Sequence, residues 1–176
     1  QDVILFNSFL NLADPYQAVT AVLFPRHFTR AFLDGKIRHA DLVESIEKAF
    51  SSLSYKHSLT IVEGTGHMGV GSIVELNNAQ VASLLQVPLV IIAPGGLGSS
   101  FDELSLNMAQ CEKYGVKVAG VILNQVHEEK REMITDYMTR ALSRWNIPLC
   151  GCIPYHSFLS SPTMGDFEQL FQTKLM

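Results

Sequence analysis

Short apolar runs recur along the chain and predict strands that are buried on both faces. The runs are rich in Val, Ile and Leu and show no regular alternation with polar residues, which is typical of the inner strands of a parallel sheet. Four such strands are expected, at residues 59–62, 89–93, 116–123 and 148–153.

Amphipathic segments separate these runs and predict helices. Apolar residues recur at helical spacing in each segment. A capping box of Asp41 and Glu44 is expected to open the first helix, and Gly115 is expected to follow the third as its C-terminal cap. The five helices are expected at residues 41–53, 78–85, 101–114, 128–145 and 164–171. This alternation predicts an α/β fold with a three-layer parallel sheet.

The first forty residues have a different pattern. They contain Pro15, Pro25 and several phenylalanines, and their apolar positions show no steady period. We therefore expect an irregular cap over residues 1–40, with one short helix at about 26–33, and a parallel α/β core over residues 41–176.

Composition narrows the class of protein. The chain has 176 residues, of which 47% are hydrophobic and 17% charged, and this suits a single packed domain. The formal net charge of -4 gives no basic footprint for nucleic acid. No apolar run is long enough for a membrane span, and no signal peptide is visible. We expect an intracellular protein of the cytoplasm or an organelle matrix.

The three cysteines fit neither a disulfide framework nor a common zinc spacing. Cys111 stands alone, and Cys150 and Cys152 form a Cys-x-Cys pair on an expected strand. Small apolar core residues are the favoured interpretation. Metal or redox use of Cys150 and Cys152 is the alternative.

Candidate ligand residues follow the expected strands, because open parallel sheets bind ligands beyond the carboxyl ends of their strands. Glu63 follows the first run and precedes a glycine-rich loop, where a carboxylate can hold Mg²⁺. A glycine-rich turn with a solvated carboxylate is the alternative. The loop residues expected to line the ligand site are Gly64, Thr65, Gly66 and His67.

The later strand ends add polar groups. Gly98 and Ser99 lie in the loop before the helix that follows the second strand, where backbone amides and the hydroxyl of Ser99 or Ser100 can bind an anion at the helix N-terminus, although an ordinary N-cap and tight turn fit equally well. Asn124 offers a donor and an acceptor that suit a nucleobase edge, although Asn also favours turns. Gln125, Pro154 and Tyr155 are expected beside it, and His67 and His156 are the histidines expected on this side.

Taken in order, these segments resemble dethiobiotin synthetase, a branch of the P-loop NTPases. The resemblance is closer to the dethiobiotin-synthetase-like domain at the N-terminus of long phosphate acetyltransferases and to its stand-alone relatives. The segments that carry it are Val-Glu-Gly-Thr-Gly at 62–66, Val-Pro-Leu-Val-Ile-Ile at 87–92, Gly-Leu-Gly at 96–98, Val-Ala-Gly-Val-Ile-Leu-Asn at 118–124 and Gly-Cys-Ile-Pro at 151–154.

The resemblance implies ATP and Mg²⁺ as cofactors and ligase-like phosphoryl transfer to a carbamate. It implies that Glu63 binds Mg²⁺, that Asn124 reads adenine, and that the segment ending at Pro154 and Tyr155 packs beside the base. Gly64 and Gly66 would line the substrate cleft.

Three departures qualify what the resemblance implies. The sequence has no G-x-x-x-x-G-K-[ST] phosphate loop. We therefore expect this loop and an N-terminal strand to precede Gln1 in a longer parent chain, or a partner chain to complete the sheet. The partner expected is a second copy, in a homodimer, or such a chain that completes the sheet. Ser100, Phe101 and Asp102 replace the family's Ile-Asn-His, whose Asn helps to hold the substrate. Residues 65–68 also depart from the usual small and aromatic residues, which indicates a changed substrate pocket.

Two functions stay open from the sequence. One is an ATP-using, ligase-like enzyme domain that a phosphate loop completes. The other is a non-catalytic regulatory or assembly module that keeps the fold.

Overall fold

The computed structural model describes residues 2–161 and 163–174, and the chain divides into two compact units. One unit comprises Gln1–Pro88 and Asn107–Lys117, and the other comprises Leu89–Leu106 and Val118–Met176. Each unit is described by itself below.

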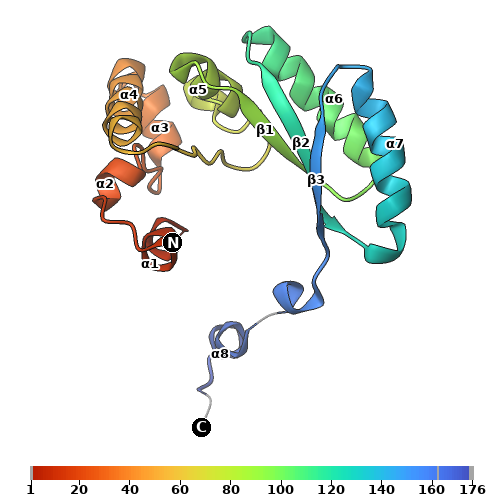
Figure 1. The fold of residues 1–176 in the computed structure, drawn as a ribbon. Helices are drawn as coiled ribbons and strands as arrows, with labels where there is room; N and C mark the ends of the chain where they lie inside the picture. Colours follow the sequence, from red (N-terminus) through yellow and green to blue (C-terminus); the bar gives the residue numbers. More distant parts are fainter. Residues whose placement is uncertain (1, 162, 175–176) are drawn as a thin grey trace. The chain divides into compact units, whose positions relative to one another are not determined.

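The second unit contains a parallel sheet of three strands in the order β1-β2-β3 (Figure 1). Its strands are β1 (Leu89–Pro94), β2 (Val118–Val126) and β3 (Leu149–Pro154). Both strand pairs are parallel. The sheet confirms the α/β class and three of the four expected strands. The second of these, β2, extends three residues beyond its expected end.

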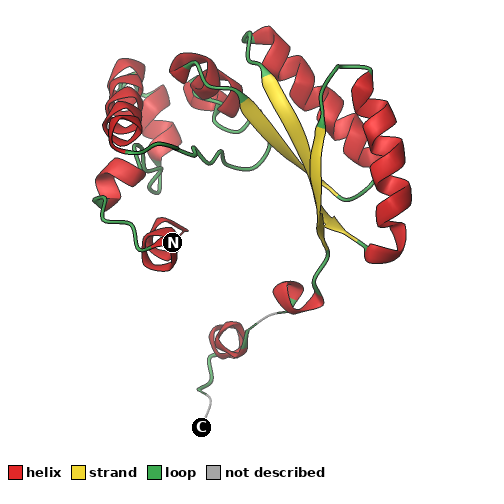
Figure 2. Cartoon of the chain, viewed as in Figure 1, coloured by secondary structure: helices red, strands yellow, loops and turns green. Residues whose placement is uncertain are grey.

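Helices pack on one face of this sheet (Figure 2). They are α7 (Arg131–Ser143), which follows the short helix η2 (Glu128–Lys130), and the part of α6 (Gly98–Lys113) that belongs to this unit. Burying each large aliphatic side chain here contributes about 1.5–3 kcal/mol. The buried residues include Ile91, Ala93, Leu104, Val121, Leu123, Ile134, Met138 and Leu142.

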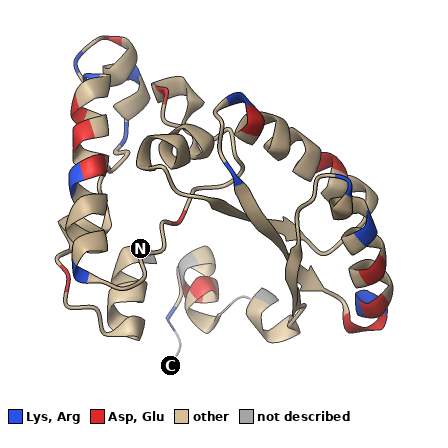
Figure 3. Ribbon diagram, turned by 45° about the horizontal axis from the view of Figure 1, so that its top comes forward, with Lys and Arg blue, Asp and Glu red and all other residues tan. Residues whose placement is uncertain are grey.

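The strands themselves carry no charged residue, and the charges of this unit lie on its helices and loops (Figure 3). The side chains of β1 nevertheless alternate between buried and exposed. Ile91 and Ala93 are buried, while Val90 and Ile92 are 50% and 63% exposed. The expectation that this strand is buried on both faces is therefore wrong.

Helices make up the first unit. They are α1 (Asp2–Leu10), α2 (Tyr16–Val19), α3 (Phe28–Leu33), α4 (His39–Lys56), η1 (Ser72–Val74) and α5 (Asn78–Leu85). Phe28, Leu42 and Val74 form its core, and Phe32 and Leu76 pack against them. Three helices therefore lie within the first forty residues, where one was expected.

The expected strand at 59–62 does not form, since residues 59–65 have no regular secondary structure. Leu59 and Ile61 are 75% and 83% exposed. A strand needs a neighbour that accepts its hydrogen bonds, and the described sheet contains only β1, β2 and β3. Glu63 therefore follows an extended segment and not a strand.

The five expected helices are present, and α4, α6 and α7 have altered ends. Helix α4 begins at His39, and Asp41 does not cap it, because its carboxylate accepts a hydrogen bond from Arg38 Nε at 2.9 Å. Helix α5 has the expected bounds, with a capping box of Asn77 and Gln80. The last two elements are η3 (Ser157–Ser160) and α8 (Met164–Phe171), the second as expected. No helix in the described ranges is long and apolar enough to cross a membrane.

Candidate functional site

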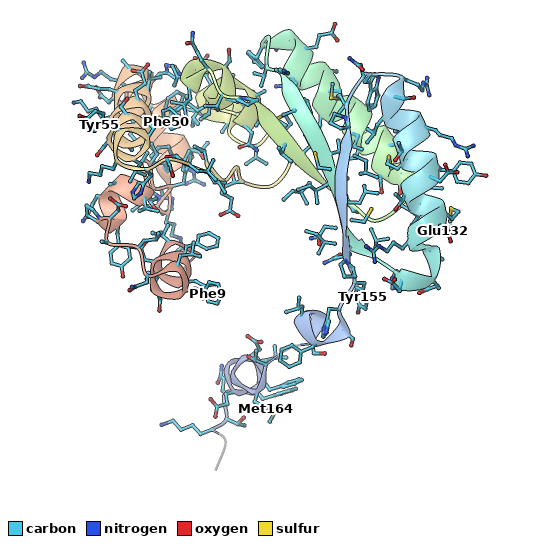
Figure 4. The ribbon with its side chains drawn as sticks, viewed as in Figure 1. Phe9, Phe50, Tyr55, Glu132, Tyr155 and Met164 are labelled. Carbon is cyan, nitrogen blue, oxygen red and sulfur yellow. The ribbon has the colours of Figure 1, made fainter. Side chains whose placement is uncertain are left out.

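The carboxyl ends of the three strands meet at one edge of the second unit. Pro94 pairs with Asn124, and Val126 pairs with Pro154. Tyr155 follows at the end of β3, where Figure 4 labels it. The sheet thus brings together Asn124, Gln125, Pro154 and Tyr155, which the sequence placed after two separate strands.

A bulge in β2 shapes this edge. Leu123 pairs with Cys152 and Val126 with Pro154, so β2 holds one more residue than β3 in this interval. Gln125 takes the left-handed conformation there, with φ of 60°. Its N–H donates to Asn124 Oδ1 at 3.0 Å. Within the described residues, no group accepts a hydrogen bond from the Asn124 amide nitrogen, and its oxygen keeps a lone pair.

The loop after β1 approaches the end of β2 closely. A Cβ at Gly95 would lie 2.7 Å from Val126 Cα, so only glycine fits there. Gly96 N–H donates to Pro94 O at 2.9 Å and tightens the turn. Gly98 and Ser99 are exposed in the first turn of α6, while Ser100 is buried. Helix α6 begins three residues before its expected start, and its first two residues are exposed at this end of the unit.

Tyr155 is held through its backbone and its ring. Its N–H donates to Val126 O at 2.9 Å. Its ring stacks on His127, with ring centroids 4.8 Å apart and an interplanar angle of 26°. The expectation omitted His127, because the strand before it was expected to end at residue 123 and extends to Val126. The ring of His156 contacts Phe158.

In the first unit, Asn78 fixes the glycine-rich loop. Its Oδ1 accepts from Thr65 N at 3.3 Å, and its Nδ2 donates to the carbonyl oxygens of Thr65 and His67 at 3.0 and 2.9 Å. A Cβ at Gly64 would lie 2.8 Å from that Oδ1, so a larger residue there would displace the Asn78 side chain. Sequence reasoning missed Asn78. The signal in the sequence was an Asn at the start of the next α-helix after the loop.

His67 takes part in the same loop. Gly69 N–H donates to His67 Nδ1 at 3.2 Å, and Met68 N–H donates to Asn107 Oδ1 at 3.3 Å. A backbone N–H can only donate, so His67 is in the tautomer that carries its proton on Nε2. The N–H groups of Thr65, Met68 and Gly69 are therefore already used as donors. The side chain of His67 is exposed and carries its proton on Nε2.

Glu63 is exposed, and no described residue forms a hydrogen bond or ion pair with its carboxylate. Within the described part of the chain, no three His, Cys, Asp or Glu residues form a group that could hold a metal ion. Mg²⁺ usually keeps several waters and binds through one or two carboxylates and the phosphates of its substrate. A single exposed carboxylate is compatible with that mode and equally with a solvated side chain, so Glu63 as a Mg²⁺ ligand stays a prediction.

Glu63, Gly64, Thr65, Gly66 and His67 belong to the first unit. The residues at the strand ends, together with Gly98 and Ser99, belong to the second. That both groups serve one ligand stays a prediction.

Phe101 stands at the position where the resemblance implies a substrate-binding Asn, and its ring packs against other side chains. Phe101 stacks on Trp145, with centroids 4.4 Å apart and an interplanar angle of 6°. The guanidinium carbon of Arg144 lies 5.8 Å from the Phe101 ring. Phe101 thus fills this position with an aromatic contact and offers no polar group.

The cysteines are not equivalent. Cys111 is buried, and burial raises the pKa of its thiol, which agrees with a core role. Cys150 is exposed, so its expected place in the core is wrong. Cys152 lies 3.4 Å from the Thr135 hydroxyl.

Comparison with known proteins gives a family match over most of the chain. The AAA_26 family, described as an AAA domain, matches residues 1–163. An ATP-dependent dethiobiotin synthetase of Anaeromyxobacter dehalogenans is 30% identical over 92 residues, which are 52% of this chain and 40% of that enzyme. Another, from Nitrosopumilus maritimus, is 20% identical over 165 residues, which are 94% of this chain and 72% of that protein.

A phosphate acetyltransferase of Nitratidesulfovibrio vulgaris is also similar, with 25% identity over 138 residues. These are 75% of this chain and 20% of that enzyme. The chain thus matches less than half the length of the first relative and a fifth of the acetyltransferase.

Proposed function

The chain belongs to the AAA_26 family of dethiobiotin-synthetase-like P-loop NTPases, and from this premise we propose that it is the nucleotide-binding part of an ATP- and Mg²⁺-dependent, ligase-like domain. The second unit binds the adenine base at the carboxyl ends of β2 and β3. Phosphoryl transfer also requires a phosphate loop, and this sequence contains no such motif. The transfer step therefore takes place only when such a loop completes the site.

The observation that carries this proposal is the burial and the hydrogen bonding of the Asn124 side chain. Its side chain is half-buried at the strand edge, and Gln125 N–H fixes which way its amide points. The free N–H groups then meet the ring nitrogens of a base, while the remaining lone pair of Oδ1 accepts from an exocyclic amino group. Adenine presents this pairing of acceptor and donor.

The other residues have supporting roles. Pro154 and Tyr155 form the apolar side of the base site, and Ser99 with the start of α6 faces anionic groups. Gly64, Thr65, Gly66 and His67 contact the second substrate, with His67 Nε2–H as a donor. Bound Mg²⁺ would neutralise phosphate charge, and Glu63 is the residue that would hold it.

The second substrate differs from the biotin precursor. Phe101 stands where the resemblance places a substrate-binding Asn, and it stacks on Trp145. The phenyl ring of Phe101 offers no hydrogen bond to a polar substrate.

Isothermal titration of the full-length natural protein with ATP and Mg²⁺ tests the proposal. A Kd tighter than about 100 μM is expected. The matched variant is Asn124→Asp, which keeps the oxygen that accepts from Gln125 N–H and removes both amide donors. We expect about a tenfold loss of affinity, as for about 1.4 kcal/mol. Absence of binding by the unmodified protein would contradict the proposal.

A non-catalytic assembly module is the second candidate. The Phe101–Trp145 stack favours it, as does the match to a phosphate acetyltransferase. Light scattering on the same protein separates the two. A stable oligomer without nucleotide binding would support the module.

A further inference from the structure

We propose that His127 is a positioning residue of the base site, which holds the ring of Tyr155 as one wall for the bound base. The inference rests on the proposed function, in which Tyr155 lies beside adenine. It adds a residue that follows β2 and that the resemblance does not assign.

The backbones of both residues are fixed by the sheet. Val126 is fully buried and pairs with Pro154, and its carbonyl oxygen accepts from Tyr155 N at 2.9 Å. His127 directly follows Val126, and Tyr155 directly follows Pro154. The two residues therefore leave neighbouring strands at the same level, which places their side chains next to each other.

The tyrosine ring depends on a neighbour for its orientation. It is 40% exposed at the end of β3, and in the described ranges its ring contact is the stack on His127. A centroid distance of 4.8 Å at 26° lies in the range of favourable aromatic pairs. A ring already held in place loses less conformational freedom when a ligand binds, so affinity rises without a new ligand contact. The stack covers one face of the ring, and in this inference the base contacts the exposed part of the ring.

A change in charge is the competing explanation for any effect of replacing His127 on ATP affinity. His127 Nδ1 lies 3.9 Å from Glu129 Oε1 on η2, and Glu128 on the same short helix pairs with Arg131 of α7 at 3.4 Å. Removing His127 therefore also removes its contact with the Glu129 carboxylate. Glu129→Gln removes this charge and leaves both rings, so it separates the two effects.

The experiment measures binding of Mg²⁺·ATP and of inorganic triphosphate to the full-length protein and its variants. His127→Ala is expected to weaken ATP binding about three- to tenfold, which is the range for an aromatic pair. His127→Phe keeps a stacked ring and is expected to restore affinity to within about twofold. Glu129→Gln is expected to bind like the unmodified protein. Triphosphate has no base, so its binding is expected to be unchanged in all three variants.

The ring signals of Tyr155 in proton NMR spectra give a readout independent of the ligand. They are expected to shift in His127→Ala and to stay near their original positions in Glu129→Gln. Unchanged ATP affinity of His127→Ala, in a protein that binds ATP, would overturn this inference and leave the proposed function intact. Equal loss in Glu129→Gln would assign the effect to charge and also overturn it. A protein that binds no ATP would fail the proposed function, and the inference with it.

Discussion

Asp14 is the clearest case of a side chain whose ionisation the fold controls. Its carboxylate is 2.7 Å from His57 Nε2 and 3.4 Å from Lys56 Nζ, and its side chain is only 11% exposed. The hydrogen bond from His57 is the largest cause that lowers the pKa of Asp14 below its ordinary 3.8, while partial desolvation opposes it.

A carboxyl whose pKa is lower in the folded state stabilises the fold above its unfolded pKa. This contribution is lost as the pH falls through the folded pKa, that is, below about pH 4. We therefore expect Asp14→Asn to lose less stability than the unmodified chain between about pH 5 and pH 2. Urea unfolding at a series of pH values measures this. His57→Gln removes the main cause of the shift and should flatten the curve in the same way. Curves parallel to the original would contradict the assignment.

Single residues show where sequence reasoning reaches its limit. Asn124 and Tyr155 were predictable, because a polar residue after an apolar run has a defined place in a parallel sheet. Asn78 and His127 were not, since their roles come from hydrogen bonds to a loop and from a ring on a neighbouring strand. Such contacts depend on the ends of elements, and His127 was missed by an error of three residues in the end of β2.

At the scale of elements, β1 offers a matched pair of substitutions. Ile91 and Ile92 are adjacent, but their side chains are 6% and 63% exposed. Ile91→Ala is expected to cost about 2–5 kcal/mol, because it leaves a cavity under the helices. Ile92→Ala is expected to cost less than about 1 kcal/mol. Denaturant unfolding gives both values, and equal costs would show that the second face of β1 is covered in solution.

Pairing between strands also explains why no strand forms at residues 59–62. Residues 59–62 and 89–93 have the same local pattern, and only pairing with another strand distinguishes them. Strand β1 pairs with β2, whereas the described sheet gives residues 59–62 no partner. Helix α5 was predicted with its correct bounds because a helix forms its hydrogen bonds within its own segment, and Asn77 caps it locally.

At the scale of the whole molecule, the chain has two groups of buried side chains, one in each unit. Leu42 belongs to the core of the first unit, and Met138 is fully buried in the second. Regions with separate cores can open separately, and hydrogen exchange detects each opening by the amides that it exposes. Met138→Ala is expected to cost about 2–5 kcal/mol and to speed exchange in β1, β2 and β3.

The amides of α4 should keep their original exchange rates in Met138→Ala, and Leu42→Ala should produce the reverse pattern. The strands bond only to one another within the described sheet, so a cavity beneath them lowers the free energy of opening for that unit first. Mass spectrometry after exchange, on peptides from α4 and from β2, measures both units in one sample. If either substitution speeds exchange in both units to the same degree, they unfold together, and the strand ends of the second unit are then only as stable as the helices of the first.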